Sequence, residues 1–239
     1  MTSRAAFEVL LLALAWAATL AVRPWRLLRP HEGRVPLATP FLACLTVLPW
    51  LWSWPGLAAL PIPLHWSGAP LVVLLLGWPL AVPVITLAGL ATLFTAGHGL
   101  AQALSLTVWT GLVPATLVLA MGYGVRKAFG PNPVAYMLGR AFFVPMLALG
   151  ACGLAAALLA DGLAGSTGGL QKVAIALLAM GEASWTCAIV SFLVAYRPQW
   201  LATWSDAMYR GRPARKPAAA RVPVPAPARI APPPPSPPR

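Results

Sequence analysis

Charged residues are scarce in this sequence of 239 residues: 9% are Asp, Glu, Lys or Arg, whereas 59% are hydrophobic. A soluble domain carries roughly a quarter of its residues as charges. Several apolar runs also exceed the ~18 residues that mark a membrane helix. The composition therefore excludes an ordinary soluble domain and predicts an all-α, polytopic transmembrane helix bundle.

Acidic residues are especially rare, with five against 17 Lys and Arg. So few carboxylates make a hydrolase with paired acids a poor hypothesis. The sequence also lacks the Gly-x-x-x-x-Gly-Lys-Ser/Thr loop that binds ATP, the His-Glu-x-x-His zinc motif and the Gly-x-Ser-x-Gly nucleophile motif. We therefore expect a protein that is not an enzyme, does not hydrolyse ATP itself and holds no permanent cofactor.

The three cysteines, Cys44, Cys152 and Cys187, are dispersed over predicted spans. They form neither a disulfide framework nor a zinc-binding spacing. We expect them to be small packing residues.

Hydropathy divides the chain into a transmembrane domain, residues 1–204, and a tail, residues 205–239. The tail is rich in proline and holds seven of the 17 basic residues. It cannot bury apolar area, so we expect it to be disordered and to lie in the cytoplasm near anionic lipid, without binding nucleic acid. Within the domain, the expected spans are 5–22, 36–54, two short helices in 64–96, 100–123, 134–160 and 172–196. The first is expected to be a retained helix, because no cleavage site follows it.

Residues 64–96 are interrupted by Gly77-Trp78-Pro79. A single helix of this length would reach roughly 50 Å, too long for a ~30 Å hydrocarbon core. A short helical hairpin gives about seven segments. It also places the Arg-rich segment 23–34, Arg126-Lys127 and the basic tail on one side, as the positive-inside rule requires. This favours an N-terminus outside and a C-terminus in the cytoplasm.

Two histidines flank this hairpin, His65 before it and His98 in the following Gly97-His98-Gly99 turn. Neutral imidazole is a good ligand for nickel, cobalt or zinc. For each residue alone, a structural role is the simpler interpretation: an interfacial hydrogen bond for His65 and a plain turn for His98. The predicted topology brings both to the outer side, so together they form a candidate metal site.

Glu182 lies within the last predicted span, where a carboxylate is costly, by some scales ~3 kcal/mol. A role in substrate binding or transport and a role as a structural hydrogen-bonding group are both open. Two other ionisable residues have simpler explanations. Glu8 is close to the outer end of its span and is expected to reach water, and Arg140 is expected to extend to the cytoplasmic interface.

Two short stretches, Leu64-His65-Trp66-Ser67-Gly68-Ala69 and Leu76-Gly77-Trp78-Pro79-Leu80-Ala81, resemble a known family. They are similar to motifs of the membrane permease component of energy-coupling-factor cobalt/nickel transporters, the CbiM/NikM-like group. Gly111-Leu112-Val113-Pro114, Gly181-Glu182-Ala183 and the ending Val194-Ala195-Tyr196-Arg197-Pro198 agree as well. The resemblance covers about residues 36–209, and the shared order of the motifs carries most of its weight.

The resemblance implies a substrate-capturing subunit of the bacterial inner membrane. Such a subunit works with a coupling transmembrane subunit and cytoplasmic ATPases to import cobalt or nickel. His65 matches a family histidine and is implied to be a metal ligand. Gly68 and Glu182 are candidate substrate-binding or transport residues, and the role of His98 rests on topology.

The sequence also departs from the family pattern. It begins Met1-Thr2-Ser3-Arg4 where metal-transporting members begin Met-His-Ile-Pro-Asp-Gly, so the N-terminal histidine ligand is absent. Leu106 and Trp109 occupy positions of a helix that bears asparagine in the family. The usual square-planar nickel site is therefore incomplete. Either the substrate differs, or His98 and other groups substitute, or the chain is a non-transporting accessory protein that keeps the fold and binds a protein partner.

Overall fold

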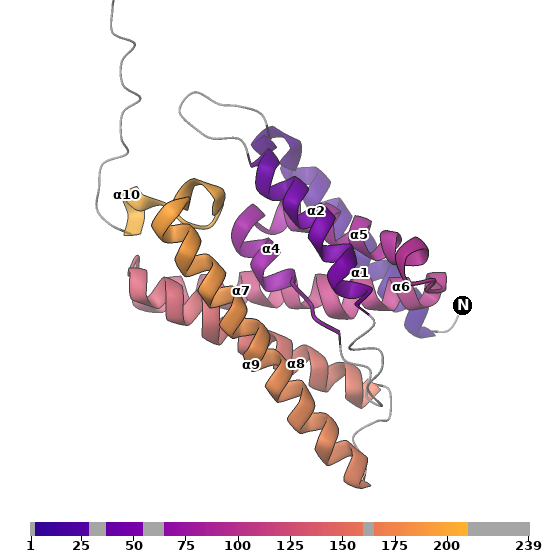
Figure 1. Cartoon of the computed structure of the whole chain (residues 1–239). Coiled ribbons are helices and arrows are strands. Elements are labelled where there is room, and N and C mark those ends of the chain that lie inside the picture. Colours follow the sequence, from indigo (N-terminus) through magenta and orange to yellow (C-terminus); the bar gives the residue numbers. More distant parts are fainter. Residues whose placement is uncertain (1–2, 29–36, 55–64, 160–164, 210–239) are drawn as a thin grey trace, which may run out of the picture.

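The computed structural model describes residues 3–28, 37–54, 65–159 and 165–209 (Figure 1). Every regular element in these ranges is helical, which confirms the predicted all-α bundle. Five helices of the described residues are long and apolar enough to cross a membrane: Arg4–Val22, Trp78–Thr95, Leu100–Phe129, Ala135–Leu158 and Gly168–Tyr196.

The segments follow the predicted order along the chain. The long elements are α1 (Ser3–Val22), α2 (Ala38–Trp52), α5 (Trp78–Thr95), α6 (Leu100–Leu106) with η2 (Thr107–Leu112) and α7 (Val113–Phe129), η3 (Ala135–Phe143) with α8 (Val144–Leu159), and α9 (Gly165–Tyr196). The short elements are η1 (Pro24–Leu28), α4 (Ala69–Leu76), η4 (Pro198–Trp200) and α10 (Asp206–Tyr209).

The predicted break at Gly77 is present. Gly77 has φ 76° and ψ 157°, a conformation that residues other than glycine rarely adopt, and it separates α4 from α5. Helix α4 has only eight residues, and all but Leu71 are buried. In Figure 1 it lies in the middle of the bundle, with α2 on one side and α9 on the other. Such a short helix is tolerated at membrane depth because protein surrounds it.

Two π-helical stretches, η2 and η3, end two residues before a proline, Pro114 and Pro145 respectively. At the end of each stretch a backbone N–H bonds to the carbonyl five residues back, Val113 to Val108 and Val144 to Gly139. A proline has no N–H, so it cannot continue the usual ladder of hydrogen bonds. Widened turns of this kind are frequent at functional sites.

Successive segments run in alternating directions, so the loops gather at two ends of the bundle. At one end, the hydroxyls of Ser53 and Thr95 are 2.6 Å apart where α2 and α5 finish; we call this the histidine end, because His65 and His98 lie there. At the other end, the Ala202 amide donates to the Leu75 carbonyl (2.8 Å).

We call this second end the basic end, because α1, α7 and α9 finish there and it carries Arg23, Arg126 and Arg197. Within the described residues, Arg23, Arg126 and Arg197 therefore share one end, in agreement with the charge pattern.

Two expectations about ionisable residues were wrong. Glu8 does not reach water: it is 3% exposed and accepts hydrogen bonds from Arg4 (3.1 Å) and the Trp109 indole (2.9 Å). Arg140 is 8% exposed, with its guanidinium 5.8 Å from the centre of the Tyr136 ring. Glu8 thus joins α1 to η2, and Arg140 is buried beside the ring of Tyr136 in its own element.

The chain continues beyond α9 in a segment that packs on the basic end. The Thr203 hydroxyl donates to the Leu74 carbonyl (2.8 Å), and the rings of Trp204 and Tyr209 stack at 4.6 Å. Tyr209 is buried, so the first residues assigned to the tail pack against the bundle. Residues 210–239 lie outside the described ranges, and their disorder stays a prediction.

Candidate functional site

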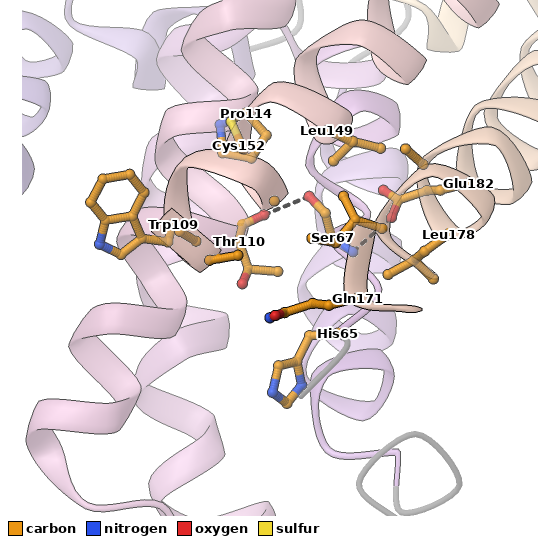
Figure 2. Close-up of a pocket in the computed structure, with 15 residues that line it drawn as sticks. His65, Ser67, Trp109, Thr110, Pro114, Leu149, Cys152, Gln171, Leu178 and Glu182 are labelled. Carbon is orange, nitrogen blue, oxygen red and sulfur yellow. Dashed lines mark hydrogen bonds between the residues drawn. The ribbon is translucent and has the colours of Figure 1, made fainter. Parts of the chain in front are cut away.

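A cavity of about 190 Å³ extends into the bundle from the histidine end (Figure 2). It lies between η2, the start of α7, α8 and α9, and is also lined by His65 and Ser67, which lead into α4. Its polar lining comes from His65, Ser67, Trp109, Thr110, Gln171 and Glu182. Its apolar lining comes from Pro114, Leu149, Cys152, Gly153, Ala156, Ala157, Ile175, Leu178 and Ala179. The structure thus brings His65 and Glu182, 117 residues apart in the sequence, to one cavity.

The Glu182 carboxylate binds the backbone at the start of α4. Its Oε2 accepts the Ser67 N–H at 2.8 Å, and its Oε1 accepts the Gly68 N–H at 2.7 Å. The side chain is 4% exposed. These two N–H groups directly precede the N-terminus of α4, where the helix dipole favours a negative charge. The carboxylate is therefore hydrogen-bonded by the protein itself and also faces the cavity.

Ser67 and Gly68 fix the turn into α4. The Ser67 hydroxyl donates to the Thr110 carbonyl, and the Ser67 carbonyl accepts the Trp52 indole N–H at 2.9 Å (Figure 2 shows the first of these bonds). Gly68 has φ 65°, and a Cβ there would meet the side chains of Leu48 and Leu51. Gly68 is thus required by the backbone, and its contact with Glu182 is through its N–H.

His65 stands two residues before this turn and is partly buried in the cavity wall. Burial lowers its pKa below the ordinary 6.5, and the positive charge of nearby His98 lowers it further. His98 is not among the residues lining the cavity. Its Nδ1 is buried without a hydrogen-bond partner among the described residues. The two histidines therefore interact electrostatically, with His65 in the cavity and His98 in the adjoining turn.

The charge of the cavity suits a cation. Glu182 is the single carboxylate among its described lining residues, and no Lys or Arg is among them. His65 adds an imidazole, and Gln171 and Ser67 add neutral oxygen donors. Among the described residues, however, no group of three or more His, Cys, Asp or Glu is placed to hold a metal ion. A metal bound here would take some of its ligands from water, backbone or residues outside the described ranges.

Sequence reasoning missed several cavity residues. Gln171, a neutral amide near the start of a predicted span, could have been singled out as Glu182 was. Cys152, expected to be a packing residue, faces the cavity. From the sequence, Trp109 is of interest only because it lies in a helix that bears asparagine in the similar family. In the structure it lines the cavity and donates its indole N–H to Glu8 (2.9 Å). No signal in the sequence indicated the last contact, because it joins residues 101 positions apart.

Comparison with protein families matches most of this chain. The family model for CbiM, described as the cobalt uptake substrate-specific transmembrane region, matches residues 5–200. Neither a curated protein nor a solved structure matches. The family match includes all the residues that line the cavity and nearly the whole length of every span of the bundle.

Proposed function

The chain belongs to the CbiM family of cobalt-uptake transmembrane components, and on this basis we propose that it is the substrate-capturing subunit of an energy-coupling-factor-type importer for cobalt or nickel. As a multi-pass membrane protein it would present the cavity to the ion and would carry out no chemical reaction. The sequence has no ATP-binding loop, so the energy would come from cytoplasmic ATPases through a coupling transmembrane subunit.

The observation that carries this proposal is the shared cavity of His65 and Glu182. A buried carboxylate with no basic residue in the same wall favours a cation over an anion. Imidazole nitrogen binds cobalt and nickel well, and the lowered pKa of His65 keeps it in the neutral form that binds metal. His98 would be a second, peripheral ligand, since its unpartnered Nδ1 lies in the neighbouring turn.

The proposed orientation follows from the distribution of charge. Arg23, Arg126 and Arg197 mark the basic end, which the positive-inside rule assigns to the cytoplasm. The histidine end then faces the outside of the bacterial inner membrane, with the N-terminus outside and the C-terminus in the cytoplasm. An outward-facing cavity is the arrangement that a capture subunit needs.

Titration of the purified chain in detergent with Co²⁺ and Ni²⁺ tests the proposal. We expect saturable binding of one ion, weakened about tenfold or more by His65→Ala and less by His98→Ala, because His98 lies outside the cavity. His31→Ala is the matched control, since the sequence places this third histidine in the loop on the cytoplasmic side; it should leave binding unchanged. No saturable binding, or equal binding by wild type and His65→Ala, would contradict the proposal.

A further inference from the structure

Both oxygens of the Glu182 carboxylate are engaged by the protein, at Ser67 N–H and Gly68 N–H. The third N–H at this turn, that of Ala69, donates to the Ser67 hydroxyl (3.2 Å), and Pro70 has none. These three donors are therefore satisfied, two of them by a side chain from a helix 114 and 115 residues later in the chain. Glu182 binds the two N–H groups that directly precede α4, and the Ser67 hydroxyl binds the first N–H of the helix itself.

This hydrogen bonding fixes the backbone that carries His65. Only Trp66 separates His65 from Ser67, so a shift of the Ser67 amide would move His65 as well. On its other side, Ser67 is fixed by Thr110 and Trp52. Of the three partners, Glu182 alone binds two consecutive N–H groups, and it is the only charged one.

We propose that Glu182 is a positioning residue, which holds the His65 imidazole in the direction that metal binding requires and does not itself ligate the ion. The inference rests on the proposed function, because it presupposes that His65 is a metal ligand. Loss of a hydrogen bond that orients a metal ligand typically weakens metal binding by about 10- to 100-fold. Here the orienting group acts through the backbone instead of through the imidazole itself.

Helix α4 is also attached at its far end to the continuation of α9. The Ala202 N–H and the Thr203 hydroxyl bind the carbonyls of Leu75 and Leu74. The two ends of α4 are thus bound by α9 and by the segment that directly follows it.

The test uses Glu182→Gln in the full chain, titrated with Co²⁺ and followed by the visible absorption of the bound ion. A glutamine can accept only one of the two N–H groups with its oxygen, so we expect cobalt to bind about tenfold more weakly. The spectrum at saturation should match that of wild type, because the ligands are unchanged. Ser184→Ala is the matched control: Ser184 is exposed on the same helix, its hydroxyl bonds only to the Met180 carbonyl, and its removal should leave affinity unchanged.

A double-mutant cycle separates positioning from general loss of structure. If Glu182 acts through His65, Glu182→Gln should have no further effect on cobalt affinity in the His65→Ala background. If Glu182→Gln does not fold, Glu182→Asp keeps the charge but is too short to bind both N–H groups, and it should show the same coupling to His65.

Three results would overturn the inference: unchanged affinity, additive effects of the two substitutions, or an altered spectrum at saturation, which would make Glu182 a direct ligand. If wild type bound no cobalt at all, the proposed function itself would fail.

Discussion

The surroundings of the His65 imidazole lower its pKa. Burial is the main cause of its lowered pKa, and the charge of His98 is the second. In the unfolded chain His65 has the ordinary pKa of 6.5, and in the folded chain its pKa is lower. At pH values between these two, His65 binds a proton more readily in the unfolded chain than in the folded chain. This histidine's contribution to stability is therefore complete above pH 6.5 and is lost as the pH falls through its folded pKa. Metal binding also weakens as the pH falls, because a protonated imidazole cannot bind a metal ion.

We predict that His65 titrates below pH 6.5 in the metal-free protein and that His98→Ala raises its pKa toward 6.5. Removing His98 removes a neighbouring positive charge, while the burial of His65 remains. Histidine-selective NMR of ¹³C-labelled protein in detergent measures this pKa directly, and His31→Ala is the control that should not change it. A wild-type His65 whose pKa is at or above 6.5 would contradict the assigned surroundings.

Rarity is the signal in the sequence that selects the candidate site residues. Histidine and acidic side chains are few in this chain, and His65, His98 and Glu182 are among them. Their partners could not be predicted in this way. The contact of Glu182 with the backbone of Ser67 and Gly68 depends on how α9 packs against α4, and backbone N–H groups have no sequence signature. The burial of Glu8 and Arg140 depended on packing for the same reason.

Among the helices, glycine and proline were the informative residues. Gly77 and Pro79 correctly predicted the break between α4 and α5, because glycine allows positive φ and proline cannot continue a helix. The sequence predicted a short helix before this break, but not where it starts: apolar composition extends from Leu64, yet α4 begins at Ala69. The π-helical stretches η2 and η3 were not predicted either, although Pro114 and Pro145 lie just after them.

Close packing of α5 against η2 gives a prediction for these elements. A Cβ at Gly89 would overlap the side chain of Thr107, which is buried and bonded to the Ala103 carbonyl. Gly89→Ala should therefore destabilise the protein by about 1–3 kcal/mol, the usual cost of overpacking. Gly150→Ala is the matched control, because a Cβ there meets nothing within 4 Å. Thermal unfolding in detergent measures both, and an equal effect of the two substitutions would contradict the close approach of α5 to η2.

For the whole molecule, the alternation of seven segments and the location of charge agree. Hydropathy alone left residues 64–96 ambiguous, and the positive-inside rule resolved the number of crossings. The structure has the predicted alternation of segments, with Arg126 and Arg197 at one end of the bundle and His65 and His98 at the other. Sequence could predict this much because charge distribution is a property of the chain as a whole. It could not predict the cavity, which depends on how four elements pack.

Reporter fusions at the two ends test the proposed orientation. A periplasmic reporter should be active after Gly97 and inactive after Gly130, since these turns lie at the histidine end and the basic end. A cytoplasmic reporter should give the opposite pattern at the same two positions. A cytoplasmic location for the 97–99 turn would contradict the proposed capture of an external ion.

The central claim is that His65, in the cavity at the histidine end, binds cobalt directly. X-ray absorption at the cobalt edge of the loaded protein tests it. We expect an imidazole contribution to the cobalt shell of wild type and of His31→Ala, and its loss or clear reduction in His65→Ala. A shell made only of oxygen, or an imidazole contribution unchanged in His65→Ala, would contradict it.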